Sequence, residues 1–169
     1  MKEVERIIRV DHAGEFGAIN IYRSQMLIAN LLYKDIKPKL AEMLEHEKEH
    51  FQRFDLWLQN NEVRHCYALW FWAFGGFVLG IITALLGRKS IWVCTNAIES
   101  TVLHHLDEQL NYLKLNSTTA YEAVLSIKSD EEEHQRYGQL HGSNSFIYLP
   151  IHWVVKYSTK FAIWLSTKL

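Results

Sequence analysis

The feature that most constrains the fold of this 169-residue chain is a lone Glu followed at a fixed distance by a Glu-x-x-His pair, a pattern that occurs twice with identical spacing. On a helix, a Glu-x-x-His pair places a carboxylate and an imidazole on one face, one turn apart, so that both can reach one metal ion. The repeat therefore predicts two helical hairpins packed face to face around an acidic centre. The two copies consist of Glu15 with Glu47 and His50, and Glu99 with Glu131 and His134.

A third pair, Glu62/His65, lacks this context. The position where the repeat would require a lone Glu before it is occupied by Asn30, and the positions where the repeat would place a second copy of the pair hold Phe146 and Leu149. We interpret this pair as a solvated helix end. The runs EHEKEH and DEEEH, taken singly, would also suit solvated helix faces, and it is the constant register between the two halves that favours metal binding.

Apolar side chains recur on the faces that carry these glutamates. Ile8 and Ile19 share a helical face with Glu15, and Val124 and Ile127 support an inward position for Glu131. Burying a carboxylate without a partner costs several kcal/mol, so inward-pointing glutamates call for a cation. Two lone glutamates with two Glu-x-x-His pairs are typical of ferritin-like di-iron and di-manganese bundles. Oxygen and nitrogen ligands favour Fe or Mn over Cu(I) and leave zinc open.

Helical periodicity and a low proline count, two in the chain, predict a single all-α domain over residues 1–169. Asp35 is a candidate N-cap for a helix with Pro38 in its first turn, and Thr119 with Glu122 has the spacing of a capping box. Four helices are expected to form an antiparallel four-helix bundle. They cover about residues 3–33, 35–59, 91–113 and 119–138.

Two further hydrophobic helices are expected outside the bundle. Residues 66–87 carry no charge, and a stretch of this length is enough to cross a bilayer. The glycines of this segment and its aromatic start at residues 67–74 favour a helix that packs on the bundle and embeds one face in the membrane interface, with a spanning helix, a core helix or a dimer contact as alternatives. The terminal helix, about 150–168, offers Trp153 and Trp164 as a second contact.

Charge and cysteine usage limit the partners and the compartment. Eighteen basic and nineteen acidic residues leave a net charge of -1, which gives no electrostatic footprint for nucleic acid. Cys66 and Cys94 lie in apolar surroundings without CxxC spacing. We expect both to be buried thiols in a reducing compartment.

The segment RVDHAGEFGAINIY, residues 9–22, resembles the first-helix signature of the demethoxyubiquinone hydroxylase family. EHEKEHFQRF, GFVLGIITALLGRKS, CTNAIESTVLHHLDEQL and DEEEHQRYG match in order over nearly the whole chain. The resemblance implies a di-iron monooxygenase of ubiquinone biosynthesis that hydroxylates a polyprenylated 3-methyl-6-methoxy-1,4-benzoquinol. It implies two Fe ions, O2 as co-substrate, and electrons from NADH or a reductase. The six family ligands fall on the six residues of the repeat.

The resemblance also implies a peripheral membrane protein on the cytoplasmic face of a bacterial inner membrane, or on the matrix face of the mitochondrial inner membrane in a eukaryote. A ubiquinone-biosynthesis complex or a homodimer is the expected assembly. His105 and Tyr22 are candidates for a relay or for contact with a metal ligand. At positions of the family's proposed electron relay in the last helix, many relatives carry Arg and Tyr where this chain has Lys160 and Trp164.

Two other functions fit parts of the pattern. An iron-handling protein or ferroxidase uses similar ligands without an organic substrate, but such proteins rarely carry a long uncharged segment. The other is a membrane-associated helical protein that uses the quinone only as a structural lipid. Iron binding that survives the loss of both Glu-x-x-His pairs would favour it.

Overall fold

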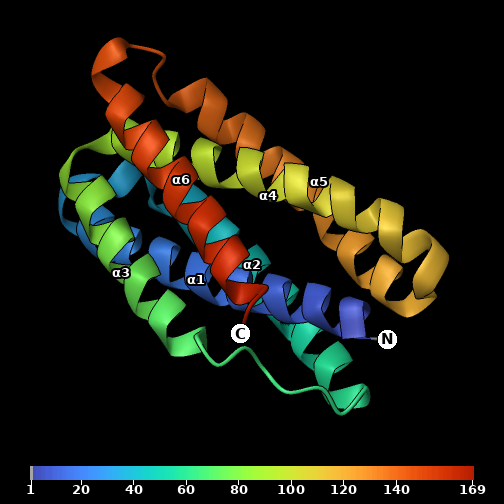
Figure 1. The fold of residues 1–169 in the computed structure, drawn as a ribbon. Coiled ribbons are helices and arrows are strands. Elements are labelled where there is room, and N and C mark those ends of the chain that lie inside the picture. The colour runs from blue at the N-terminus through green and yellow to red at the C-terminus, as the bar shows by residue number, and fades with distance from the viewer. Residues whose placement is uncertain (1) are drawn as a thin grey trace.

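The computed structural model describes residues 2–169, and all of the regular structure in that range is helical (Figure 1). No strand occurs among these residues, which confirms the all-α prediction. Short 3-10 turns occupy Lys34–Ile36 and Phe146–Tyr148. The six α-helices are α1 (Lys2–Leu32), α2 (Lys37–Asn60), α3 (Leu69–Leu85), α4 (Arg88–Asn116), α5 (Thr118–His141) and α6 (Leu149–Ser166).

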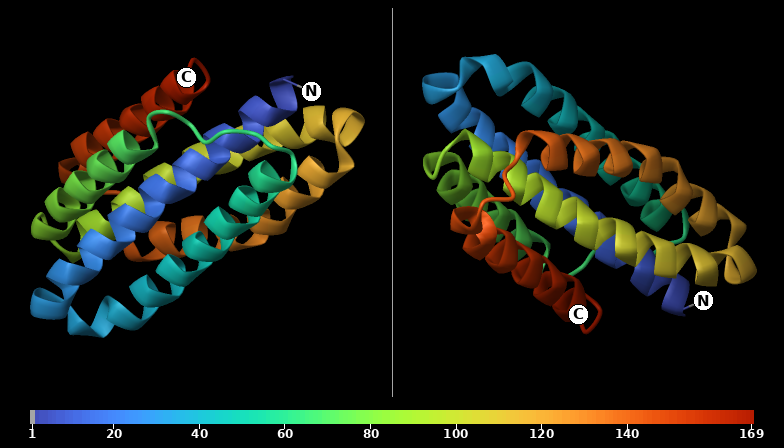
Figure 2. Two further views of the ribbon diagram at one scale, coloured as in Figure 1. Left: turned by 90° about the horizontal axis from the view of Figure 1, so that it is seen from below. Right: turned by 90° about the horizontal axis from the view of Figure 1, so that it is seen from above.

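The helices form three layers, as Figure 2 shows. The middle layer holds α1 and α4. On one side α2 packs against α1 and α5 against α4, and on the other side α3 packs against α1 and α6 against α4. The hairpins α1–α2 and α4–α5 correspond to the two expected from the repeat. In each of them a short turn connects two long helices.

Apolar side chains pack at both ends of these two hairpins. One cluster includes Ile8, Phe54 and Ile127, and a second includes Leu40 and Trp92 at the opposite end. On each of the four helices the glutamates and histidines of the repeat lie between residues of the two clusters. The hydrophobic effect therefore holds the hairpins together on either side of a polar layer.

The apolar segment folds as α3, whose backbone lies directly against α1. A Cβ atom at Gly76 would meet the carbonyl oxygen of Gly17, and one at Gly80 would meet the carbonyl oxygen of Ile21 and the hydroxyl of Ser24. Only glycine allows this approach. The helix has 17 residues, and within residues 2–169 no helix is long and apolar enough to span a membrane.

Both predicted N-caps are wrong. Asp35 lies within the 3-10 turn, where its carboxylate accepts a hydrogen bond from Arg88 at 2.8 Å, and Ile36 precedes α2 instead. Thr119, the other prediction, lies inside the first turn of α5. Ser117 caps this helix, because its extended backbone lets its hydroxyl accept from the Ala120 amide at 3.4 Å. Pro38 does lie in the first turn of α2, as predicted.

The predicted states of the cysteines and of the third Glu-x-x-His pair have different outcomes. Cys66 and Cys94 are both buried and free, as expected. Glu62 lies in the turn directly after α2, with a left-handed φ of 55°, so this part of the predicted helix end is correct. His65 lies in the following loop, against the Asp55 carboxylate of α2, and is therefore not part of a helix end.

Candidate metal centre

The six side chains of the repeat converge from four helices into the polar layer. Each is at most 5% exposed. Their buried positions follow from the apolar residues one turn away on the same faces. They are Glu15 of α1, Glu47 and His50 of α2, Glu99 of α4, and Glu131 and His134 of α5.

These side chains form two overlapping groups, in each of which one ligand atom per residue lies within 4.8 Å of the others. Glu47 and Glu131 belong to both groups. Glu15 and His50 complete one, and Glu99 and His134 complete the other. Each group thus offers one imidazole, one unshared carboxylate and two shared carboxylates. Four carboxylates carry a charge of -4, which two divalent cations balance.

Each imidazole faces the carboxylate of the opposite hairpin's pair. His50 Nδ1 lies 3.0 Å from Glu131 Oε1, and His134 Nδ1 lies 3.3 Å from Glu47 Oε1. Buried polar atoms are normally hydrogen-bonded. Among residues 2–169, however, both Nδ1 atoms, Glu47 Oε1 and Glu131 Oε2 have no hydrogen-bond partner. Buried nitrogen and oxygen atoms without hydrogen-bond partners fit a pair of bound cations, to which they can act as ligands.

The far side of each imidazole contacts a residue that sequence reasoning missed. Asp130 Oδ2 lies 3.1 Å from His50 Nε2, and His46 Nδ1 lies 3.1 Å from His134 Nε2. Such partners direct the other ring nitrogen toward a metal and increase its basicity. The only sequence signal was position, since Asp130 and His46 each directly precede the Glu of a pair.

The buried carboxylates of this centre repel one another. Burial raises the pKa of Glu47 and of Glu99 well above the usual range, and the neighbouring charge of Glu131 adds to both shifts. The pKa of Glu131 itself is lowered, because its contacts with His50 and His134 outweigh its burial. A cation in the centre relieves the repulsion that produces the raised values.

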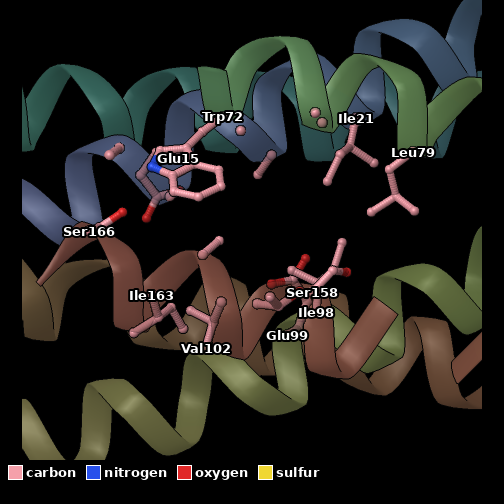
Figure 3. A pocket seen from close by; sticks show the side chains of 18 of the residues that line it. Glu15, Ile21, Trp72, Leu79, Ile98, Glu99, Val102, Ser158, Ile163 and Ser166 are labelled. Atoms are coloured by element: carbon pink, nitrogen blue, oxygen red, sulfur yellow. The ribbon is translucent and has the colours of Figure 1, made fainter. Parts of the chain in front are cut away.

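An apolar cavity of about 350 Å³ leads to this centre between α1 and α3 on one side and α4 and α6 on the other (Figure 3). Its walls include Trp72, Leu79 and Ile163. Four carboxylates of the centre line this cavity, namely those of Glu15, Glu47, Glu99 and Glu131, whereas neither histidine of the repeat does. The carboxyl group of Asp11, on α1, lines it as well. A flat organic molecule in this cavity can reach the oxygen side of the centre while its remaining surface contacts hydrocarbon.

The two residues proposed for a relay lie at different places. Tyr22 is buried, and its hydroxyl donates a hydrogen bond to Glu99 Oε1 at 2.9 Å. His105 lies on the cavity wall and outside both groups of candidate ligands. Burial lowers the pKa of His105, so its imidazole is neutral near pH 7.

The fold and the centre define a class of protein, in which helical hairpins enclose a carboxylate–histidine cluster suited to two metal ions. The chain belongs to the family of the ubiquinone biosynthesis protein COQ7, whose family model matches residues 2–166.

Three relatives show how far this similarity extends. The chain is 36% identical over 170 residues to the NADPH-dependent 3-demethoxyubiquinone 3-hydroxylase of Dictyostelium discoideum, covering 98% of this chain and 77% of that protein. It is 34% identical over 171 residues to the mitochondrial enzyme of the same name from Homo sapiens, covering 98% and 78%. The 3-demethoxyubiquinol 3-hydroxylase of Rhodospirillum rubrum is 30% identical over 167 residues, covering 98% and 78%.

Proposed function

We propose that this protein is a monooxygenase of ubiquinone biosynthesis that hydroxylates a polyprenylated demethoxyubiquinol ring, using O2 and a pair of iron ions. The observation that carries this proposal is the apolar cavity that ends on four carboxylates of one buried centre. The names of the relatives supply the substrate class. An iron-handling protein without an organic substrate has no use for such a cavity.

The six converging residues would hold the two iron ions, and Glu47 and Glu131 belong to both groups of candidate ligands. The bound irons would supply the activation of O2. The apolar walls exclude water from the ring and orient it toward the carboxylates. Asp130 and His46 orient the two imidazoles. The Tyr22 hydroxyl stays protonated and donates its hydrogen bond to Glu99, because burial raises the pKa of Tyr22 well above the usual range.

The electron source follows the relatives in outline. The Dictyostelium and human proteins are named as NADPH-dependent, so we propose that a nicotinamide nucleotide supplies the electrons, directly or through a reductase. Hydroxylation by O2 leaves one oxygen atom to be reduced to water, and two electrons with two protons meet this requirement.

We further propose that α1, α2, α4 and α5 form a ferritin-like four-helix bundle and that α3 and α6 attach it to the membrane surface. Trp70 and Phe74 of α3 are 76% and 68% exposed, and Trp153 and Trp164 of α6 are 48% and 56% exposed. Aromatic side chains favour the interfacial region of a bilayer. The cavity lies between these two helices, so a polyprenyl tail can remain in the lipid while its ring reaches the centre.

Complementation of a strain that lacks the hydroxylase tests the function. We expect wild type to restore ubiquinone, and Glu131→Ala to accumulate the demethoxy precursor because the shared carboxylate is lost. Glu132→Ala is the matched control, since its exposed side chain pairs only with Lys128 among residues 2–169. Restoration by Glu131→Ala would remove this residue from the centre. Failure of wild type, with Fe(II) oxidation intact in the purified protein, would favour iron handling.

A further inference from the structure

A second cluster of metal-ligating side chains lies outside the six-residue centre. His12 of α1, Asp55 of α2 and His65 of the loop between α2 and α3 each offer one ligand atom, and these atoms lie within 4.8 Å of one another. None of the three belongs to the repeat. His12 lies one helical turn before Glu15, and its imidazole stacks on Phe51 at 4.1 Å.

The buried His12 imidazole lacks a hydrogen-bond partner within the described part of the chain. It is fully buried, yet neither ring nitrogen has a hydrogen-bond partner among residues 2–169. Leaving a buried polar group without a partner destabilises the folded protein. Burial and the nearby His65 lower the pKa of His12 to about 4, and Asp55 opposes this shift. The ring is therefore neutral at physiological pH and keeps a lone pair for a metal ion.

The geometry of the cluster matches a shared ion better than a set of hydrogen bonds. Asp55 Oδ1 lies 3.5 Å from His12 Nε2 and 3.2 Å from His65 Nε2, but it has no hydrogen-bond partner in the described chain. Zinc bonds of about 2.0–2.1 Å in tetrahedral geometry place neighbouring ligand atoms about 3.3 Å apart. The other oxygen, Asp55 Oδ2, accepts a hydrogen bond from Gln59 at 2.7 Å, which orients the carboxylate.

We propose that His12, Asp55 and His65 bind a divalent transition-metal ion, best matched by Zn²⁺, at a site separate from the six-residue centre. Two imidazoles and one carboxylate leave a fourth position for water. Ions can reach the site, because the side chains of His65 and Asp55 are 45% and 24% exposed. The ion joins α1, α2 and the loop that leads into α3, and so fixes the start of the helix that walls the cavity.

Zinc binding by the iron-loaded protein tests the proposal. The protein is incubated with Zn²⁺ and desalted, and zinc and iron are measured together. We expect wild type to retain one zinc per chain with its iron unchanged, and His65→Ala to retain none. His104→Ala is the matched control, since it removes an exposed histidine from α4, far from this cluster in sequence. Equal zinc in wild type and His65→Ala, or zinc gained only as iron is lost, would overturn the proposal.

Cleavage by trypsin after Arg64 gives a second readout that does not depend on metal analysis. Arg64 is exposed in the loop next to His65. Zinc should slow this cleavage in wild type and in His104→Ala, because the ion ties the loop to two helices, and it should have no effect in His65→Ala. Asp55→Asn, which keeps the size of the side chain, should behave like His65→Ala. Protection that persists in both variants would contradict the site.

Discussion

The close contact of α3 with α1 can be tested by placing a methyl group inside it. At Gly80 an added Cβ would run into the backbone carbonyl of Ile21 and the hydroxyl of Ser24. At Gly75, on the same helix, an added Cβ meets nothing within 4 Å. The pair Gly80→Ala and Gly75→Ala therefore makes the same chemical change on one helix in a closed and in an open environment.

The expected difference follows from two opposing contributions. Replacing glycine by alanine inside a helix stabilises it by about 1 kcal/mol. Overpacking a close contact costs about 1–3 kcal/mol, and the upper end applies at Gly80 because a backbone carbonyl cannot rotate away as a side chain can. The helical gain is common to both variants, so the difference between them isolates the packing cost. Gly80→Ala should be about 3 kcal/mol less stable than Gly75→Ala.

Urea denaturation followed by circular dichroism measures this difference, with both variants at the same metal loading. For a chain of this size, 1 kcal/mol shifts the melting temperature by about 2–4 °C, so about 3 kcal/mol corresponds to about 6–12 °C between the two variants. Gly75→Ala should melt slightly above wild type. Equal stability of the two variants would show that α3 does not lie in backbone contact with α1.

Three further changes test the centre, the cavity and the membrane face. Asp130→Asn should weaken iron retention about 10–100-fold in a chelator competition, because the carboxylate no longer orients His50. Burial raises the pKa of Asp11 from 3.8 to about 7, against a hydrogen bond from Gln109. Stability that depends on neutral Asp11 is thus lost as pH rises from about 4 through 7. Asp11→Asn should melt above wild type at pH 8 and close to it at pH 4. Phe74→Glu should reduce co-flotation with lipid vesicles.

Each of these changes has a control or an opposing outcome. Unchanged iron retention in Asp130→Asn would mean that His50 needs no partner. A parallel pH profile of melting temperature for Asp11→Asn and wild type would show that Asp11 ionises freely. For the vesicle assay the control is Leu115→Glu, at a leucine 85% exposed near the end of α4. Equal loss of vesicle binding in both glutamate variants would reflect charge alone and would contradict a membrane face on α3.

Much of the fold could be predicted because the buried face of a helix appears as a periodic pattern in the sequence of that helix. Residues on one helical face recur every three to four positions, so the apolar faces of α1, α2, α4 and α5 could be identified from the sequence. Their ends were harder to predict. Asp35 and Ser117 are both good capping residues, but only the backbone angles at each position decide which one caps a helix.

For the centre, the chain by itself determined which six residues would come together, since one spacing repeated in two hairpins allows few other arrangements. The sharing of Glu47 and Glu131, the contacts of Asp130 and His46, and the cavity between α3 and α6 came only from the tertiary structure. The same holds for His65, which pattern alone had set aside. Spacing specifies positions on one helix, whereas distances between helices depend on how closely their side chains and glycines let the backbones pack.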